Sequence, residues 1–344
     1  MSVSCKYGSH RVIEPKGVLP QAALVIDPTP VCRDNELLID VDILNIDSAS
    51  FHQIKQACGH HPQQMKEMII DIVKKQGKMQ NPVTKSGGML IGTIKEVGPL
   101  HHDQSLKPGM KIATLVSLSL TPLTIEQIVS INLDNDQVKI KGQAILFDSG
   151  VYAIIPEDLD EKVALAALDV CGAPAQVKAL CHEGDTVLII GAAGKSGLLC
   201  AYQAMKEVGE SGRIIGLVNE ESQQALLKTL GLCHDIILAD ATNALAVYQQ
   251  VEKRTNGRLA DVTINVVNVD NTEMSSVLAT RDEGIVYFFS MATSFTKAAL
   301  GAEGVGKDVK MIIGNGYTKN HAQITLDIIR ESKPLYDLFY QRYA

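Results

Sequence analysis

A short glycine-rich stretch in the second half of the chain carries the clearest chemical signal. Residues 186–197 read T-V-L-I-I-G-A-A-G-K-S-G, which predicts a buried strand, a tight turn and the start of a helix. A turn that binds a dinucleotide needs small residues, because the chain bends sharply, its backbone approaches the pyrophosphate and the helix packs closely on the strand. Gly194 and Gly197 fill the second and third places of the G-x-G-x-x-G pattern, and Ala192 stands in the first.

The same stretch indicates which cofactor binds. A phosphate-binding loop of the nucleotide triphosphatases would need a glycine at position 189, where Ile189 stands, so that interpretation fails. After the next strand, Asn219 and Glu220 lie where an acid would bind the ribose 2′-hydroxyl, and no Arg or Lys is adjacent, which favours NAD over NADP. The alternative is a tight turn in a fold that has lost its cofactor. The predicted cofactor contacts are Gly191, Ala192, Ala193, Gly194, Lys195, Ser196, Gly197 and Asn219.

The elements that must position this turn change character near residue 160. The first part is strand-rich, with strands predicted over 36–46, 90–97 and 111–118, one helix over 63–76, and a polar, turn-like stretch at 132–141. The second part alternates helix and strand six times, which is typical of a doubly wound parallel sheet. Its predicted strands are 186–190, 213–218, 236–238, 261–267, 284–289 and 309–313, and its predicted helices are 161–168, 175–179, 196–208, 222–230, 244–254, 273–279 and 321–331.

Two domains follow from this change. We expect a strand-rich domain over 1–160 and a dinucleotide-binding domain over 161–332, with the tail 333–344 packing on the first domain. Within the single predicted helix of the first domain, Met65, Met68, Ile69 and Ile72 form a stripe that should face the core.

Composition excludes several classes of protein. The 344 residues hold 39 acidic and 32 basic side chains, a net charge of −7, so nucleic acid is not an expected partner. No apolar run is long enough to span a bilayer, and the first residues lack the apolar core of a secretory signal. The seven cysteines contain no C-x-x-C pair, which predicts free thiols and a cytoplasmic protein.

Further motifs carry a family resemblance. Gly92 to Gly98 reads G-T-I-K-E-V-G, Lys107 to Lys111 reads K-P-G-M-K, and Cys171-Gly172 precedes the glycine turn. This order resembles the medium-chain dehydrogenase/reductase superfamily, which includes the zinc alcohol dehydrogenases. The resemblance implies an α/β fold in which a Rossmann doubly wound parallel sheet accompanies a strand-rich, GroES-like catalytic domain, with the active site in the cleft between them.

The family's zinc sites are not matched. Asp47 stands at the first catalytic zinc ligand, Gly87-Gly88-Met89 replaces the segment of the second, and only Cys171 is kept. A catalytic zinc needs three protein ligands, so we expect no metal. Residues 116–131, where the structural zinc lobe would lie, contain no cysteine.

A narrower resemblance comes from residues 6–21, 86–92 and 169–175. They are similar to a zinc-free group of diamino-acid dehydrogenases within the superfamily. The resemblance implies NAD-dependent oxidative deamination of a 3,5-diamino acid in lysine fermentation, with that small molecule as the partner. Two alternatives stay open: a zinc-free, NADP-dependent reductase of quinones or enoyl thioesters, and a non-catalytic nucleotide sensor.

The resemblance also suggests site residues. Asp47 would hold the C3 ammonium or act as base, or else cap a turn; His52 lies where the family has a proton-relay histidine, or is a loop residue. Asp169 would bind an ammonium or form a helix-end ion pair, and Cys171 would be catalytic or a packing thiol. A charged cluster near the N-terminus would bind the substrate carboxylate and distal ammonium, or be a solvated strand; its members are Arg11, Glu14 and Lys16.

Two histidine pairs and one edge strand complete the candidates. The pairs His60-His61 and His101-His102 lack acidic or cysteine partners at ligand spacing, so we expect surface loops rather than metal sites. The strand at 309–313 could pair with its copy in a homodimer or higher homo-oligomer, as often happens in this superfamily.

Overall fold

The computed structural model describes residues 4–133, 136–290, 292–314 and 316–343. The chain divides into two compact units, Met1–Glu157 and Asp158–Ala344. Each has its own hydrophobic core and its own six-stranded sheet. Among the described residues no single helix is long and apolar enough to cross a membrane, although one bent helix pair over 161–180 passes that test jointly.

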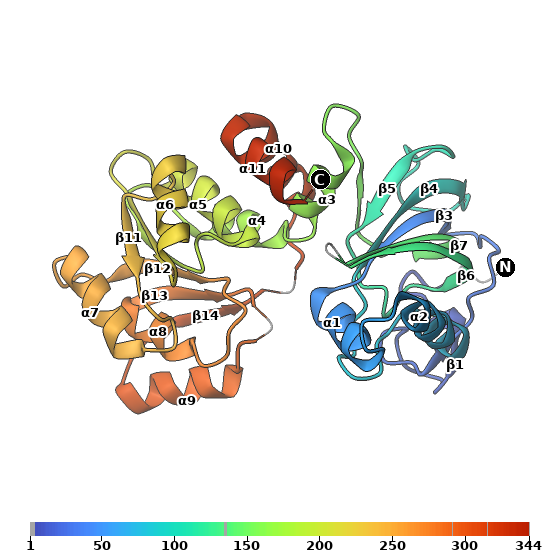
Figure 1. The fold of residues 1–344 in the computed structure, drawn as a ribbon, viewed down its shortest axis with the longest axis horizontal. Helices are drawn as coiled ribbons and strands as arrows, with labels where there is room; N and C mark the ends of the chain where they lie inside the picture. The colour runs from blue at the N-terminus through green and yellow to red at the C-terminus, as the bar shows by residue number, and fades with distance from the viewer. Residues whose placement is uncertain (1–3, 134–135, 291, 315, 344) are drawn as a thin grey trace. The chain divides into compact units, whose positions relative to one another are not determined.

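The first unit is built on an antiparallel sheet in the order β6-β7-β3-β4-β5-β8 (Figure 1). The predicted strands at 36–46, 90–97 and 111–118 are confirmed, the last one ending early, at Thr114. The strands are β3 (Glu36–Asn45), β4 (Met89–Val97), β5 (Lys111–Thr114), β6 (Leu123–Asn132), β7 (Gln137–Phe147) and β8 (Tyr152–Ile154), with a separate pair β1 (Val12–Glu14) and β2 (Val25–Ile26).

The prediction of a turn-like stretch at 132–141 is wrong for most of its length. Residues 137–141 begin β7, which pairs with β6 over Leu123↔Ala144 to Asn132↔Gln137. Most β6 side chains are exposed or half-buried, so the strand lacks the clean alternation of apolar and polar residues on which strand prediction depends. Of the described residues between the two strands, Leu133 and Asp136 are in turns.

Two helices follow β3 along the chain. Helix α1 (Ser48–Ala57) was not predicted, and α2 (Pro62–Gln76) confirms the predicted helix. The stripe on α2 faces the core: Met65, Ile69 and Ile72 are buried in the cluster that also fills the sheet, and Met68 packs against it half-buried.

The N-terminal segment is attached to the first unit by two buried cations. Arg11, 1 % exposed, forms an ion pair with Glu36 at the start of β3. Lys78 is fully buried and donates to the carbonyl oxygen of Pro20 at 2.7 Å. A long charged side chain is rarely buried unless its head is paired or hydrogen-bonded, so both residues have a structural role.

The second unit contains a parallel sheet in the order β11-β10-β9-β12-β13-β14 (Figure 1). This is the doubly wound order, and the strand order reverses between β9 and β12. The strands are β9 (Thr186–Ile190), β10 (Arg213–Val218), β11 (Asp235–Leu238), β12 (Ala260–Asn265), β13 (Thr280–Phe288) and β14 (Lys310–Ile313). All six predicted parallel strands are confirmed within a few residues at their ends.

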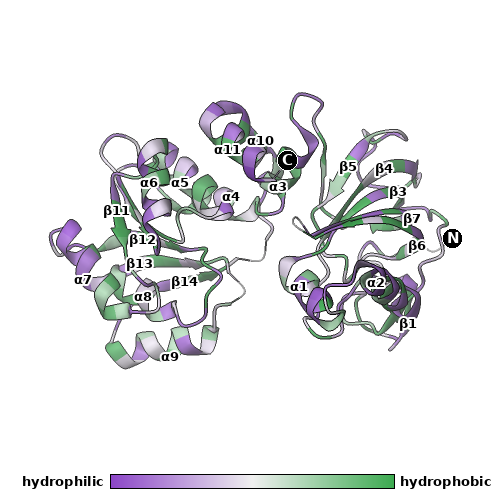
Figure 2. Ribbon diagram, viewed as in Figure 1, coloured by the Kyte–Doolittle hydropathy of each residue, from purple (hydrophilic) through white to green (hydrophobic). Residues whose placement is uncertain are grey.

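Helices cover both faces of this sheet. Successive residues of β9 point to opposite faces: Val187 and Ile189 pack under α5, while Leu188 and Ile190 pack over α7. Figure 2 shows the contrast between the largely hydrophobic β11 and the largely hydrophilic α7. The helices are α3 (Glu161–Leu168), α4 (Gly172–Leu180), α5 (Lys195–Val208), α6 (Glu221–Leu230), α7 (Ala244–Arg254), α8 (Glu273–Ala279), α9 (Phe295–Val305), α10 (His321–Glu331) and α11 (Lys333–Tyr343).

The C-terminal tail is a helix of the second unit. In α11, Leu335 and Phe339 are fully buried in the core cluster that contains α5. The expectation that residues 333–344 pack on the strand-rich domain therefore gives way to a helix that completes the dinucleotide-binding unit, because its apolar residues are already covered there.

Candidate functional site

The glycine turn joins β9 to α5 and has the geometry that its sequence predicts. Gly191 has a φ of +88°, a left-handed conformation that suits glycine. A Cβ on Gly197 would lie 2.2 Å from the carbonyl oxygen of Gly191, so the helix can approach the turn only with glycine there. Gly194 precedes α5 as its N-terminal cap residue, with no side-chain cap, which leaves the first N–H groups of the helix for an anion.

A pocket of about 340 Å³ opens beside this turn. It lies at the carboxyl ends of the parallel strands, where ligands bind in sheets of this type. Asn219 follows β10 and Asp240 follows β11, and among the described residues that line the pocket none is Lys or Arg. The lining residues are Gly191, Gly194, Leu217, Val218, Asn219, Gln223, Asp240, Ala241, Val266, Val267, Asn268 and Val269.

A second pocket, of about 640 Å³, adjoins the first, with which it shares Val266 and Asn268. It is lined by Ser196 at the start of α5, by Phe289 and Ser290 after β13, and by Ile313 at the end of β14 with the glycines that follow it. Ser290 Oγ lies 3.3 Å from Asn268 Oδ1. Two adjoining pockets near a glycine turn match the two halves of a dinucleotide.

Sequence reasoning missed Asp240, Asn268 and Ser290. Each directly follows a predicted parallel strand, or lies within a residue or two of its end, and the carboxyl ends of such strands meet at one edge of the sheet. The location of these residues at the carboxyl ends of predicted strands is the sequence signal that could have identified them. The predicted contacts Gly191, Gly194 and Asn219 do line the first pocket, and Ser196 lines the second.

Lys195 and Asp169, predicted for different purposes, lie together. Lys195 Nζ forms an ion pair with Asp169 Oδ2 at 2.5 Å, and both side chains are partly exposed. Asp169 caps the C-terminal end of α3, so the helix-end ion pair, one of the two predicted alternatives, is the one observed. The pair holds the lysine side chain beside the glycine turn.

Cys171 is a packing residue. Its side chain is buried in the core of the second unit, and burial raises the pKa of the thiol to about 12. A thiol with such a pKa stays protonated near neutral pH and is neither a nucleophile nor a ready metal ligand.

Asp47 follows β3 and caps the N-terminus of α1. Its Oδ1 accepts hydrogen bonds at 3.0 Å from Ser50 N and from Ser86 Oγ. The hydroxyls of Ser50, Thr84 and Ser86 bond to one another within 2.9 Å and so hold this corner together. The other oxygen, Oδ2, is buried and has no hydrogen-bond partner among the described residues.

This unpaired oxygen distinguishes Asp47 from an ordinary cap. A buried carboxylate oxygen without a donor is costly, and such an oxygen is available to an incoming N–H or ammonium group. Gly88 makes the corner tight, since a Cβ there would lie 2.6 Å from Asp47 N. His52 lies on α1 and is exposed, and its side chain forms no hydrogen bond or ion pair within the described part of the chain.

The N-terminal charged cluster does not converge on a common point. All five N–H groups of Arg11 have protein acceptors: both oxygens of Glu36 and the carbonyl oxygens of Asp27, Thr29 and Val31. The prediction that Arg11 binds a substrate carboxylate is therefore wrong, because no donor is left. Glu14 is exposed, and Lys16 Nζ donates to the carbonyl oxygen of Val12.

Comparison with known proteins bears on this geometry. The sequence profile of the L-erythro-3,5-diaminohexanoate dehydrogenase N-terminal domain matches residues 10–156. The enzyme of that name from Acetoanaerobium sticklandii is 58 % identical over 340 residues, which cover 98 % of this chain and 99 % of the relative. The one from Fusobacterium nucleatum is 55 % identical over 344 residues and the full length of both chains.

Solved structures with the same fold are more distant in sequence. An alcohol dehydrogenase from Thermotoga maritima has a TM-score of 0.56 at 16 % identity, with 92 % of this chain and 86 % of that one covered. The CurK enoyl reductase has a TM-score of 0.55 at 17 % identity, with 90 % and 78 % covered. These oxidoreductases confirm the medium-chain dehydrogenase/reductase fold that the sequence motifs predicted, and the full-length relatives confirm the narrower resemblance. The chain therefore belongs to the L-erythro-3,5-diaminohexanoate dehydrogenase family.

Proposed function

We propose that this chain catalyses the oxidative deamination of L-erythro-3,5-diaminohexanoate at C3 with NAD, giving 5-amino-3-oxohexanoate, ammonium and NADH. The full-length similarity to two dehydrogenases named for this substrate carries the proposal. In the balanced reaction the C3 hydrogen leaves as hydride, the ammonium group loses one proton, and water then replaces the nitrogen at the resulting iminium carbon. The nicotinamide cofactor supplies the hydride acceptor.

The second unit supports the cofactor assignment. The backbone of the turn at Gly191 and Gly194 and the free N–H groups of α5 would hold the pyrophosphate. NAD is favoured over NADP because the carboxylate of Asp240 lines the first pocket and would repel a 2′-phosphate. Asn219 is polar and uncharged, and it could bind the ribose hydroxyls.

The first unit supports a role for Asp47. Its unpaired, buried Oδ2 would accept a hydrogen bond from the C3 ammonium and then take its proton. The backbone N–H of Ser50 and the hydroxyl of Ser86 donate to Oδ1 and so orient the carboxylate, and the Ser50 hydroxyl bonds to that of Ser86. His52, exposed one helical turn further along α1, would pass that proton to solvent.

The proposed reaction uses no catalytic zinc. Of the three family ligand positions, Asp47 is an aspartate, Gly88 has no side chain, and Cys171 is a buried thiol with a raised pKa. This residue set does not supply the three ligands that a catalytic zinc needs. Asp47 would therefore do by hydrogen bonding what a metal does by polarisation.

We further propose that the cytoplasmic enzyme forms a homo-oligomer through β14. This strand ends the parallel sheet, and its outer edge pairs with no other strand among the described residues. An unpaired edge strand is a template for pairing with a second copy. Light scattering on the purified chain would test this, and a monomer would contradict it.

The activity test follows NADH formation by the purified chain with L-erythro-3,5-diaminohexanoate at alkaline pH. Parallel reactions contain NADP in place of NAD, and a chelator. We expect turnover with NAD, little with NADP, and no loss of initial rate on brief chelator treatment.

Other outcomes would redirect the assignment. No amine turnover, together with NADPH-dependent reduction of a quinone or an enoyl thioester, would replace the proposal with a reductase. Nucleotide binding without turnover of any of these substrates would favour a sensor.

The cofactor site has its own test in Gly194→Ala. The nearest atom to a Cβ at Gly194 is Gly191 O, at 3.4 Å, so the variant should fold. The added methyl group would occupy the path of the pyrophosphate, and we expect the Kd for NAD to rise at least about tenfold. An unchanged Kd would contradict this position of the phosphates.

A further inference from the structure

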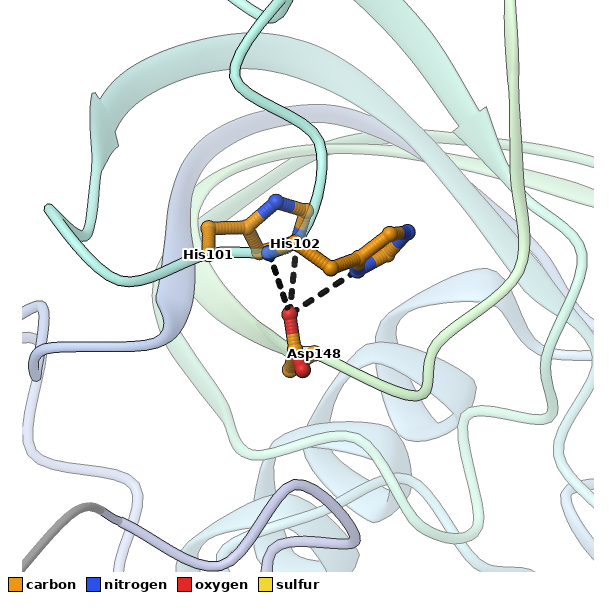
Figure 3. A group of neighbouring side chains, drawn as sticks. All are labelled: His101, His102 and Asp148. Carbon is orange, nitrogen blue, oxygen red and sulfur yellow. Dashed lines mark hydrogen bonds and ion pairs between the residues drawn. The ribbon is translucent and has the colours of Figure 1, made fainter.

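Folding brings together a cluster of possible metal ligands in the first unit, far from the glycine turn in sequence. His101 and His102 lie in the connection between β4 and β5, and Asp148 follows β7 (Figure 3). One ligand atom from each residue can be chosen so that all three lie within 4.8 Å of one another. The prediction that this histidine pair lacks an acidic partner is therefore wrong, because Asp148 reaches it through the fold.

His101 is buried and only partly satisfied. Its side chain is inaccessible to solvent, and its Nε2 has no hydrogen-bond partner among the described residues. Its Nδ1 lies 3.3 Å from the carbonyl oxygen of Asp103 and 3.2 Å from Asp103 N, so either tautomer finds a partner on that side. When Nδ1 donates to the carbonyl, as in most metal-bound histidines, the Nε2 lone pair points toward Asp148.

Asp148 is oriented by the backbone. Its Oδ1 accepts hydrogen bonds at 2.8 Å from His102 N and lies 2.8 Å from His102 Nδ1. Although burial raises the pKa of this carboxyl group, those bonds outweigh it and hold the pKa below its usual value. Burial lowers the pKa of His101. A carboxylate oxygen and histidine nitrogens are donor types that bind divalent transition metals.

We propose that His101 Nε2, His102 Nδ1 and the Asp148 carboxylate bind one divalent transition-metal ion of the zinc class. The two histidine nitrogens lie 3.9 Å and 2.8 Å from Asp148 Oδ1. These distances bracket the roughly 3.3 Å between ligand atoms around a tetrahedral zinc ion with bonds of about 2.0–2.1 Å. The His102 side chain is 58 % exposed, so its ring can rotate to open the gap and water can fill the fourth position.

The ion would fasten the loop between β4 and β5 to the end of β7. Backbone bonds already hold both ends of this region: Gly98 N donates to Glu36 O, and Ser149 N donates to Lys6 O. Nitrogen and oxygen ligands of this kind favour zinc over magnesium or calcium. The site is separate from the positions that match the family's zinc ligands, and its role is structural, so it does not depend on the proposed function.

Calorimetric titration with ZnCl2 tests the proposal. The full-length chain, without a histidine tag and stripped with chelator, should bind one zinc ion, and zinc should raise its melting temperature. In Asp148→Asn, which keeps the acceptor of the His102 N–H but removes the charge, we expect the Kd to rise at least about tenfold. His102→Ala removes an exposed ligand, so it provides the same test if Asp148→Asn does not fold.

The other histidine pair provides the matched control. His60→Asn together with His61→Ala removes two adjacent, exposed histidines of the same unit, and zinc binding should be unchanged. The proposal is overturned if the wild-type chain binds no zinc, if both site variants bind it as tightly as the wild type, or if the control variant loses binding equally. In these cases Asp148 acts only as a hydrogen-bonding anchor for the loop.

Discussion

The two ends of strand β3 place a carboxylate in opposite situations. At its start, Glu36 is saturated: Arg11 donates to both of its oxygens, and His10 Nε2 and Arg33 N bond to one oxygen each. Beyond its end, Asp47 has two donors on Oδ1 and, among the residues that the structure describes, none on Oδ2. A saturated buried charge holds the chain together, whereas a half-satisfied one is available to a ligand. The contrast supports a structural role for Glu36 and the proposed chemical role for Asp47.

The largest effect on stability should come from Glu36, at the start of β3. Glu36→Gln removes the charge that Arg11 faces while both side chains stay buried. Breaking one partner of a buried ion pair leaves an uncompensated charge, so the free energy of unfolding should fall by about 3–5 kcal/mol. Urea denaturation measures this loss.

An exposed ion pair of the same unit gives the control. Asp40 lies 3.7 Å from Lys95, and about half of each side chain is exposed. Asp40→Asn should change the free energy of unfolding by less than about 1 kcal/mol. Equal losses in the two variants would show that Glu36 has no special structural weight.

At Asp47, beyond the other end of β3, we expect the reverse: a small effect on stability and a large effect on activity. Asp47→Asn keeps an oxygen to accept from Ser50 N and Ser86 Oγ, so we expect a small shift in melting temperature. Without the charge and the basic oxygen, kcat/KM for the diamino acid should fall about 100-fold or more. Steady-state rates of NADH formation measure this change.

A second aspartate that caps a helix serves as the control, because it distinguishes a catalytic role from a capping role. Asp160 caps α3 in the same way, with its Oδ1 accepting from Lys162 N at 2.9 Å and from Val163 N at 3.2 Å. Asp160→Asn should leave kcat/KM within about twofold of the wild-type value. If Asp47→Asn is equally active, its open oxygen has no role in the reaction.

The contrast between the ends of β3 could not be obtained from the sequence. The sequence points to Asp47 only because the family has its first zinc ligand at this position. It leaves open whether Asp47 acts on substrate or caps a turn. The saturation of Arg11 depends on Glu36 and on carbonyl groups at residues 27–31, which only folding brings around it. Non-local contacts of this kind leave no pattern in the chain.

The parts that were predicted depend on local constraints. Parallel strands such as β9 are short apolar runs, and Gly191 and Gly197 are required by backbone geometry. The helices α1 and α9 were missed, and α9 contains Gly301 and Gly304, which disfavour a helix. Tertiary packing, with Ala298 and Ala302 buried, stabilises α9 instead.

Acid should reduce the difference between wild type and Glu36→Gln. Burial raises the pKa of Glu36, but the bonds from Arg11 and His10 outweigh it and lower the pKa from 4.5 to about 2. The folded state therefore binds this proton less readily than the unfolded state, and the stabilisation is complete above about pH 4.5. It should be lost as the pH falls toward 2, where Glu36 becomes neutral like glutamine.

Urea denaturation of both chains at pH 7, 4.5 and 3 measures this change. The gap in unfolding free energy should be similar at pH 7 and pH 4.5, and smaller by about 1–2 kcal/mol at pH 3. A gap that does not depend on pH would mean that the variant disrupts packing rather than the ion pair.

The smallest effect should come from Lys16, which tests whether the N-terminal segment has any chemical part. Lys16 Nζ is already bonded to the carbonyl oxygen of Val12, and its neighbour Arg11 has no free donor. Lys16→Ala should therefore change KM for the diamino acid by less than about twofold. A rise in KM of tenfold or more, with kcat unchanged, would instead mean that this lysine binds the substrate carboxylate, and that the start of β3 serves substrate binding as well as stability.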